Sequence, residues 1–377
     1  MKNKKLDYIN LFQYIDLIKS GVNEFKGEKK YVATGYLDTG VIHNYEWIDF
    51  QSRPSRANME FSMNDIIFAK MKDTEKVFLI DEDSSKNIYS TGFSGLRIND
   101  FSKLMPKYVY YWLRSDDFQN LKNKNCSGTT QKAINNSKLK SFRIPIYDIE
   151  LQKQIVNKLE NLEKLIGYRN ESLILSNMFL ECLFIDYFGD LRLNNKDWEI
   201  FELKDVANIV MGQSPPGDSY NDEGVGKEFF QGKAEFGEMY PTVGKWTTEP
   251  KRIANKASIL FSVRAPVGSV NIANIECCIG RGLAAIESED KLNNLYLFYY
   301  FKIIEDTIAS RGTGSTFKSI NKSQLSSLKV PVPPIELQNQ FADIVQQVEE
   351  IKKHQLESKL ELENLFSNLM QKAFRGE

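Results

Sequence analysis

Two long stretches of the chain carry apolar residues at helical spacing. The first runs from Ile149 to about Tyr187 and the second from Ile335 to about Phe374. Apolar side chains recur in both at intervals of three, four and seven positions with charged residues between them, which predicts two long amphipathic helices. Each helix would have about 35 to 40 residues and a length of about 50 to 60 Å. The predicted apolar stripe comprises Ile155, Leu159, Leu162, Ile166, Leu173, Leu180 and Leu183 in the first helix, and Phe341, Ile344, Val348, Ile351, Leu362, Leu365 and Leu369 in the second.

The remainder of the chain alternates short strand patterns with turn clusters. This texture predicts two globular regions of mixed α/β content, residues 1–148 and 196–334, each followed by a helical segment, residues 149–190 and 335–377. In the first region we expect strands at Lys30–Thr34 and Asp65–Lys70 and a helix at Pro106–Ser115, and in the second region we expect strands at Ser258–Val263 and Leu283–Ile286.

The two halves of the chain repeat one sequence design. At an offset of 186 residues, segments 134–154 and 320–340 are identical at 11 of 21 positions, whereas unrelated segments agree at about one position in twenty. Both contain the pattern Pro-x-x-x-Ile-Glu-Leu-Gln-x-Gln, in which the Pro ends an extended segment and the Glu lies in the first helical turn. A period of this length has the size of a domain with its connecting element and indicates a tandem duplication. Two further pairs of segments are more weakly similar. They are Tyr108–Trp112 with Tyr296–Tyr300, and Asp65–Phe68 with Ser258–Phe261.

The long apolar stripes need a partner surface. A helix of this length cannot bury its stripe against one small domain, whereas two such helices bury both stripes by packing together as a coiled coil. The alternative is that each helix lies across its own domain. The shared entry sequence and the similar lengths of the two stripes favour pairing.

Composition narrows the classes of function. The 377 residues include 49 basic and 50 acidic ones, and a net charge of −1 argues against a sequence-blind nucleic-acid binder while leaving room for a local basic face. We expect a cytoplasmic protein without membrane segments, because the chain has neither an apolar run of transmembrane length nor a signal-peptide core. The four cysteines, which lack the paired spacing of a zinc site or a disulfide framework, are Cys126, Cys182, Cys277 and Cys278.

A search for catalytic residues finds no convincing set. His43 and His354 are the only histidines, which argues against histidine-based triads and metal sites. Residues 226–234 have the wrong glycine spacing for a phosphate-binding loop. Val332-Pro333-Pro334 has a valine where an amino-methyltransferase has Asn or Asp, and the Glu-x-Lys patterns within residues 24–30 lack the Pro-Asp of a nuclease. We therefore expect no catalytic residue, metal ion or cofactor in this chain.

A loop rich in Gly, Ser and Thr and ending in a lysine also occurs twice. It lies at Ser127–Lys132 and, 186 residues later, at Thr313–Lys318. Backbone amides, hydroxyls and one positive charge suit contacts with phosphate. A turn whose hydroxyls cap the next short helix explains the same composition equally well, so both interpretations stay open.

The duplicated layout resembles the specificity (S) subunit of Type I restriction-modification systems. The resemblance rests on the helix entries Pro145–Gln154 and Pro331–Gln340, each preceded by a variable globular region, and it covers essentially the whole chain. Trp198–Val206 and Gly212–Pro215 also resemble the start of a target-recognition domain of that family. The resemblance implies an α+β fold with two target-recognition domains, each followed by a long α-helix. It further implies that the two helices pair as an antiparallel coiled coil with pseudo-twofold symmetry.

The resemblance also implies a non-catalytic function. In that family each recognition domain reads one half of an asymmetric, bipartite sequence in double-stranded DNA, and the paired helices fix the unspecified spacer. The helices dock two modification (methyltransferase) subunits, and restriction (translocase and nuclease) subunits complete the complex. S-adenosylmethionine, Mg and ATP would then belong to the partner subunits. The residues of the helix entries that we expect to contribute to docking are Glu150, Gln152, Gln154, Glu336, Gln338 and Gln340.

Several residues are candidates for DNA contacts. The loop Gly212–Ser219 offers Gln213 and Ser214 as groove readers, and arginine commonly pairs with guanine as glutamine does with adenine. For each candidate, an ordinary surface position is the alternative. The first half lacks the Trp-x-x-x-x-Leu start and the Gly-Gln-Ser-Pro loop, which predicts that the two half-sites differ. The remaining candidates are Lys233, Lys245, Arg264, Arg281 and Lys318 in the second domain and Lys70, Lys72, Arg97 and Lys132 in the first.

Two other classes of function stay open. A non-catalytic coiled-coil scaffold would recruit other partners and would show no salt-dependent DNA binding. A self-contained restriction enzyme would need the methyltransferase and nuclease motifs that the search did not find. Neighbouring genes for a methyltransferase and an ATP-driven translocase would favour the specificity subunit.

Overall fold

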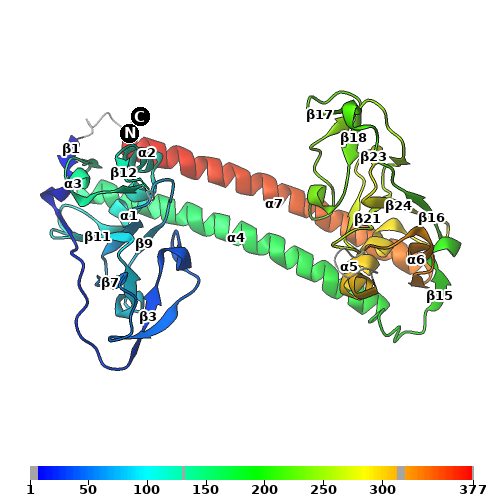
Figure 1. Cartoon of the computed structure of the whole chain (residues 1–377), viewed down its shortest axis with the longest axis horizontal. Coiled ribbons are helices and arrows are strands. Elements are labelled where there is room, and N and C mark those ends of the chain that lie inside the picture. Colours follow the sequence, from blue (N-terminus) through cyan, green and yellow to red (C-terminus); the bar gives the residue numbers. More distant parts are fainter. Residues whose placement is uncertain (1–6, 130–131, 312–318, 376–377) are drawn as a thin grey trace. The chain divides into compact units, whose positions relative to one another are not determined.

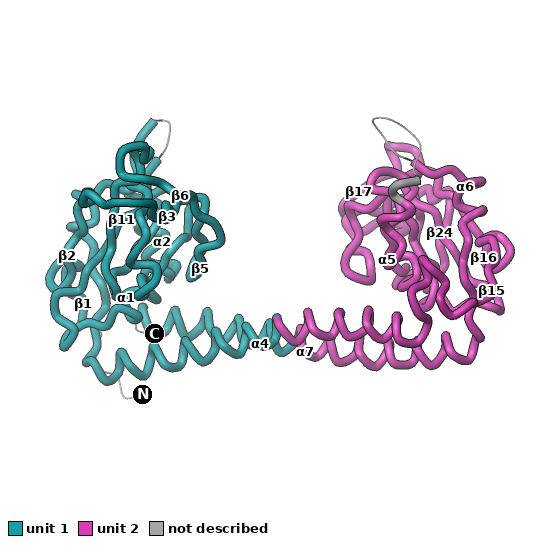
Figure 2. Tube along the Cα trace, turned by 90° about the horizontal axis from the view of Figure 1, so that it is seen from below, with its two compact units in different colours: residues 1–170, 357–377 teal, residues 171–356 magenta. Residues whose placement is uncertain are grey.

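The computed structural model describes residues 7–129, 132–311 and 319–375 of the chain (Figure 1). They form two compact units, which Figure 2 distinguishes by colour. Unit 1 comprises residues 1–170 and 357–377, and unit 2 comprises residues 171–356. Each unit contains one globular domain and a part of each long helix.

The two long helices are α4 (Ile149–Phe188) and α7 (Ile335–Arg375). They contain 40 and 41 residues and begin at the isoleucines of the two repeated entries. Unit 1 holds the N-terminal part of α4 with the C-terminal part of α7, and unit 2 holds the opposite parts, so the helices run antiparallel. Among the described residues, no helix carries an apolar segment long enough to cross a lipid bilayer.

Side chains of the two helices meet in both units. In unit 1, Leu159 of α4 and Phe374 of α7 belong to one hydrophobic core. In unit 2, Phe184 of α4 packs against Phe341 of α7 with ring centroids 5.3 Å apart. The predicted antiparallel pairing is confirmed. Both cores also contain residues of the globular domains, so the helix ends pack on the domains as well as on each other.

The buried seam of α7 departs from the predicted stripe. Ile351 and Leu365 were expected to be buried, but each is 53% exposed. The seam passes instead through Lys352 and Gln355. Lys352 forms ion pairs with two carboxylates at 2.8 and 2.9 Å, and Gln355 donates a hydrogen bond to a serine of α4 at 2.8 Å. Lys352 occupies a seam position because it has two carboxylate partners, which a hydrophobicity pattern does not register, whereas Gln355 has a partner for its amide nitrogen and none for its buried Oε1.

Unit 1 is built on two four-stranded sheets. Its elements are β1 (Asp7–Asn10), β2 (Ile15–Leu17), β3 (Glu28–Val32), β4 (Leu37–Asp38), β5 (Val41–Ile42), β6 (Glu46–Asp49), β7 (Ala57–Glu60), β8 (Ile66–Ala69), β9 (Val77–Leu79), β10 (Ile88–Ser90), β11 (Phe93–Ile98), α1 (Pro106–Arg114), α2 (Asp116–Lys124), β12 (Cys126–Ser127), β13 (Ala133–Ile134), α3 (Asn136–Leu139) and β14 (Arg143–Ile146). One sheet has the antiparallel order β2-β11-β8-β9. The other has the order β6-β3-β10-β7 with β3 and β10 parallel. Strand β1 pairs with β14, which leads into α4.

Unit 2 repeats the main features of this topology, with five strands in its second sheet in place of four. Its elements are β15 (Glu199–Glu202), β16 (Ala207–Met211), β17 (Tyr220–Asn221), β18 (Lys227–Phe230), β19 (Trp246–Thr247), β20 (Ile253–Ala254), β21 (Ile259–Ser262), β22 (Val270–Ile272), β23 (Cys277–Ile279), β24 (Leu283–Ser288), α5 (Asn294–Arg311), α6 (Lys322–Ser326) and β25 (Lys329–Val332). The order β16-β24-β21-β22 corresponds to β2-β11-β8-β9, and the parallel pair β18 and β23 corresponds to β3 and β10. Strand β15 pairs with β25 before α7 as β1 does with β14 before α4. The tandem duplication predicted from the sequence is therefore present in the fold.

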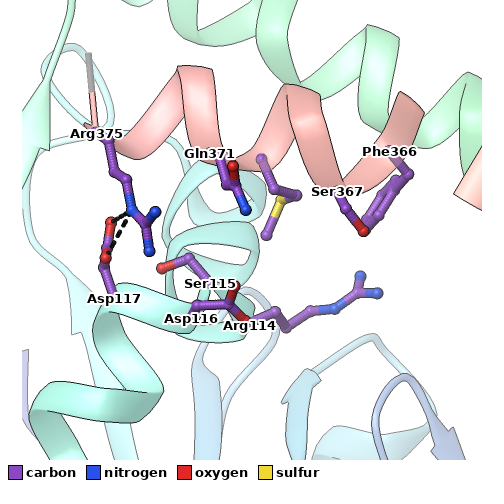
Figure 3. A pocket seen from close by; sticks show the side chains of 9 residues that line it. Arg114, Ser115, Asp116, Asp117, Phe366, Ser367, Gln371 and Arg375 are labelled. Atoms are coloured by element: carbon purple, nitrogen blue, oxygen red, sulfur yellow. Dashed lines mark hydrogen bonds and ion pairs between the residues drawn. The ribbon is translucent and has the colours of Figure 1, made fainter. Parts of the chain in front are cut away.

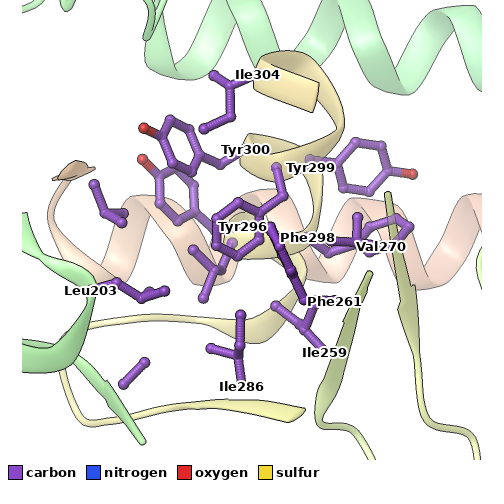
Figure 4. Close-up of a cluster of buried hydrophobic side chains, with 14 of the residues drawn as sticks. Leu203, Ile259, Phe261, Val270, Ile286, Tyr296, Phe298, Tyr299, Tyr300 and Ile304 are labelled. Atoms are coloured by element: carbon purple, nitrogen blue, oxygen red, sulfur yellow. The ribbon is translucent and has the colours of Figure 1, made fainter. Parts of the chain in front are cut away.

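An aromatic helix anchors the core of each domain. In unit 2, Tyr296 of α5 is fully buried and packs among the side chains shown in Figure 4. Its hydroxyl donates to the carbonyl oxygen of Pro331 at 2.6 Å, and the hydroxyl of Tyr108 on α1 donates to that of Pro145 at 3.0 Å. Burial raises the pKa of both tyrosines, so both phenols stay neutral donors. The two prolines belong to the repeated entries, so each aromatic helix is tied to the start of a long helix.

The C-terminal end of α7 is fixed to the domain of unit 1 (Figure 3). Arg375 Nε lies 2.9 and 3.0 Å from the two carboxylate oxygens of Asp117, which is in the first turn of α2. One residue earlier, Phe374 packs on Tyr108 with ring centroids 5.2 Å apart. The last turn of α7 is thus held by both an ion pair and an aromatic contact.

Candidate nucleic-acid interface

Four of the residues predicted to contact DNA line one cavity of unit 2. Ser214 follows β16, Arg264 follows β21 and Arg281 precedes β24. These three strands are neighbours, and their pairing places the three residues at one edge of the sheet. Lys233 follows β18, whose parallel partner β23 leads directly into β24. The cavity has a volume of about 620 Å³.

Glycines let the backbone segments around this cavity approach closely. A Cβ at Gly212 would lie 2.1 Å from the carbonyl oxygen of Gly280, and one at Gly282 would lie 2.3 Å from that of Gln231. No side chain fits at such distances without moving the backbone. Packing therefore explains the glycine of the Gly-Gln-Ser-Pro loop, and the loop holds Ser214 at the cavity.

The cavity carries an excess of positive charge. Arg264 and Arg281 are exposed, and neither has a carboxylate partner within the described part of the chain. Arg281 is oriented from one side, because its Nε and its backbone nitrogen each lie 3.3 Å from Ser214 Oγ. Lys233 lies 3.5 Å from Glu305. Among the described lining residues the one carboxylate is that of Glu235, which accepts a hydrogen bond from the Gly232 N–H at 3.0 Å. Two guanidinium groups without a counter-ion suit contact with a phosphate or a base edge.

Three other predicted residues of the second domain do not line this cavity. Gln213 is exposed, and its backbone N–H donates to the carbonyl of Ile279 at 3.0 Å. Lys245 is exposed, and its carbonyl accepts the N–H of Phe229 at 2.9 Å. Lys318 lies outside the described residues. Contacts of these three with DNA stay predictions.

Three of the four candidates in unit 1 lie together. The Lys72 N–H donates to the Lys132 carbonyl at 2.8 Å, and the Ile134 N–H donates to the Lys70 carbonyl at 2.9 Å. Lys72 and Lys132 are exposed. Lys70 is half-buried, and burial lowers the pKa of its ammonium group. Backbone pairing therefore gathers three lysines at one edge of the domain.

Arg97 is separate from these lysines. It lies beside the beginning of β8, since the strand register pairs Leu96 with Ile66, whereas the lysines follow the end of that strand. Its Nε and Nη2 donate to the two carboxylate oxygens of buried Asp65 at 2.7 and 2.6 Å. Contact of Arg97 with DNA stays a prediction. Asp65 was not predictable as the partner of Arg97 from sequence spacing, because the two residues belong to different strand segments.

The six docking candidates divide into buried and exposed residues. Gln152 and Gln338 have no exposed surface, so neither side chain is available to a partner in this structure. Gln152 accepts one backbone N–H at 3.1 Å and donates to two carbonyls at 2.8 and 2.9 Å, and Gln338 makes the equivalent bonds at 2.9, 3.0 and 2.7 Å. Each glutamine thereby ties its helix to the loop before the aromatic helix. The exposed candidates are Glu150, Gln154, Glu336 and Gln340.

The histidines contribute no visible site. His43 and His354 are exposed and lie 3.5 and 3.2 Å from the carboxylates of Asp38 and Glu350. Across the described residues, no group of His, Cys, Asp and Glu side chains is arranged to hold a metal ion. The distinctive chemistry of both domains lies in their basic edges.

Two segments of the chain, residues 12–174 and 195–363, match the family model for the Type I restriction modification DNA specificity domain. The chain belongs to this family. Each matched segment of this specificity subunit contains one globular domain and a part of the helix that follows it. A putative type I restriction enzyme MjaX specificity subunit of Methanocaldococcus jannaschii is 34% identical over 339 residues, which cover 85% of this chain and 80% of the relative.

Solved structures agree with the assignment to the specificity family. A chain from work on complex assembly and conformational transition of the type I R-M system has a TM-score of 0.68 at 32% identity, with 100% of this chain and 99% of that chain covered. The S subunit of a Type I system from M. genitalium has a TM-score of 0.61 at 18% identity, with coverage of 99% and 97%, and supports the fold alone.

Proposed function

We propose that each globular domain of this Type I specificity subunit binds one half of a bipartite target in double-stranded DNA, and that the chain itself catalyses nothing. The observation that carries the proposal is the cavity of unit 2, which gathers Ser214, Lys233, Arg264 and Arg281 from distant parts of the sequence. Guanidinium, ammonium and hydroxyl groups are the groups that contact phosphates and base edges in DNA complexes. In unit 1 the edge with Lys70, Lys72 and Lys132 takes the corresponding role.

The paired helices fix the spacer and dock the partners in this proposal. The exposed entry residues Glu150, Gln154, Glu336 and Gln340 occupy the same positions of the two repeated helices. A repeated surface offers two equivalent sites, which suits two copies of one modification (methyltransferase) subunit. Restriction subunits complete the complex, and S-adenosylmethionine, Mg and ATP bind to the partner subunits.

Methylome sequencing tests the proposal. The chain and its cognate modification subunit are expressed together in a host without other methyltransferases, and the modification subunit alone serves as the control. We expect methylation at an asymmetric, two-part motif only when both are present. An identical motif without this chain would contradict DNA reading by the chain, and it would leave the coiled-coil scaffold as the function to examine.

A further inference from the structure

The register of the strands defines equivalent positions in the two domains. Ala69 pairs with Phe93 at one edge of unit 1, and Ser262 pairs with Leu283 at the corresponding edge of unit 2. The next backbone bond is also shared, because the N–H of Lys70 donates to Gly92 at 3.0 Å and the N–H of Val263 donates to Gly282 at 2.9 Å. The positions next to these bonded residues, one residue further from the sheet on each strand, differ between the two domains.

Arginines at this edge of unit 2 are replaced in unit 1. Arg264 corresponds to Met71, and each forms a bridge to the segment before the next short helix. Arg281 corresponds to Thr91, because each lies two residues before the start of its strand. A Cβ placed on Gly92 would be 2.6 Å from the methyl carbon of Thr34, 3.3 Å from Ser90 Oγ and 3.7 Å from Met71 Sδ, so Met71 lies beside Gly92 at this edge of unit 1.

We propose that Arg264 and Arg281 determine the specificity of the second domain for a G·C pair, and that Met71 and Thr91 give the first domain an A·T pair at its equivalent position. The inference rests on the proposed DNA reading by both domains. Arginine binds guanine O6 and N7 with two parallel hydrogen bonds, whereas Thr and other methyl-bearing side chains contact the C5-methyl group of thymine.

The divergence itself separates base contacts from phosphate contacts. Under the proposed function both domains meet phosphates of the same chemistry, so positive charge is expected at this edge in both domains, whereas the residues that read bases follow the half-site. Arg264 and Arg281 do not recur. Arg281 is also held in orientation by Ser214, and a fixed guanidinium plane is what two parallel bonds to one base require.

Exchanging the equivalent residues tests the inference. The double variants R264M/R281T and M71R/T91R are each expressed with the modification subunit, and the methylated motif is determined by methylome sequencing. We expect R264M/R281T to change one specified base in one half-site and M71R/T91R to change one in the other, with the spacer unchanged. Discrimination at the affected position should fall by about 10- to 100-fold.

The lysine variant R264K/R281K distinguishes base reading from charge. It keeps both positive charges but loses the planar fork, so we expect the guanine preference to weaken while methylation of the remaining sites persists. It also keeps the inference testable if an exchange variant does not fold, which a thermal unfolding curve of each purified complex detects. Two results would show phosphate contacts and overturn the inference. One is a wild-type motif from R264K/R281K. The other is an even loss of methylation at all sites, with an unchanged motif, in R264M/R281T.

Two control variants complete the test. R192M removes an exposed arginine of unit 2 that is paired with Asp190 and does not line the cavity, so it should leave the motif unchanged. R56M removes an exposed arginine of unit 1 whose carbonyl accepts the Thr91 N–H at 2.8 Å. A changed base in R56M would mean that Arg56 reads the first half-site in place of Met71 and Thr91. Failure of the proposed function is a different result, because the motif would then be independent of the wild-type chain.

Discussion

At the scale of single residues, the two domains satisfy one buried position with different chemistry. In unit 1 the Asp65 carboxylate is bound by Arg97 and by the Ser62 N–H at 2.6 Å. By strand register, Ser258 and Glu287 occupy the corresponding places in unit 2, and the serine hydroxyl donates to the glutamate at 3.0 Å. The pair has changed from two opposite charges to one charge and one hydroxyl. Both solutions leave no buried polar atom without a partner, which explains how sequences can diverge on a common fold.

Removing Arg97 should destabilise unit 1 by about 2 kcal/mol, because the buried Asp65 carboxylate would lose its counter-ion. Breaking a fully buried ion pair costs roughly 3 to 5 kcal/mol. The expected cost here is lower because the Arg97 side chain is 48% exposed. Denaturant unfolding of R97M measures the effect, and D65S/R97M should recover most of it. The control K86M removes an exposed pair with Asp83 and should be nearly neutral. Equal losses in R97M and K86M would contradict the argument.

At the scale of elements, local patterns located the two long helices, α1 and several strands, but not α2, α3 or α6. Strand predictions at Asp65–Lys70 and Leu283–Ile286 correspond to β8 and β24, and the two long helices begin at the predicted residues. Strand order was not readable, because β18 joins the sheet through a parallel partner far along the chain. Gln231 and Glu235, which line the cavity after β18, were therefore not among the predicted site residues. The repeated helix-entry sequence alone also could not distinguish the buried glutamines Gln152 and Gln338 from the exposed Gln154 and Gln340.

Substituting alanine for Gln152 should destabilise the protein by about 2 to 4 kcal/mol, because three backbone groups inside the domain would lose their partner. Q338A should have the same effect in unit 2, since its amide makes the equivalent hydrogen bonds. Thermal unfolding compares them with Q154A and Q340A, which remove exposed glutamines two positions further along each helix. Those controls should change the stability by less than about 0.5 kcal/mol. An unchanged melting temperature in Q152A would contradict the structural role of the entry glutamine.

At the scale of the whole molecule, a net charge of −1 conceals strongly uneven local charge. Three cations line one cavity of unit 2, and three lysines share one edge of unit 1. Attraction to DNA depends on such local clusters more than on total charge, because salt screens charges over about 8 to 10 Å. The total charge therefore could not locate the basic edges. Their positions follow only from strand order, which brings residues together from loops far apart in the sequence.

The length of the helix pair should set the spacer of the DNA target. The boundary between the two units follows Asn170 in α4 and Leu356 in α7. Inserting seven residues after each of these positions lengthens both helices equally and keeps their heptad register. Seven residues add about 10 Å, which corresponds to about three base pairs at about 3.4 Å each. Methylome sequencing should show a spacer longer by about that amount with both half-sites unchanged. The same insertion in α4 alone shifts one helix past the other and should abolish methylation. A double insertion that methylates sites with the original spacer would show that the helices do not act as the ruler.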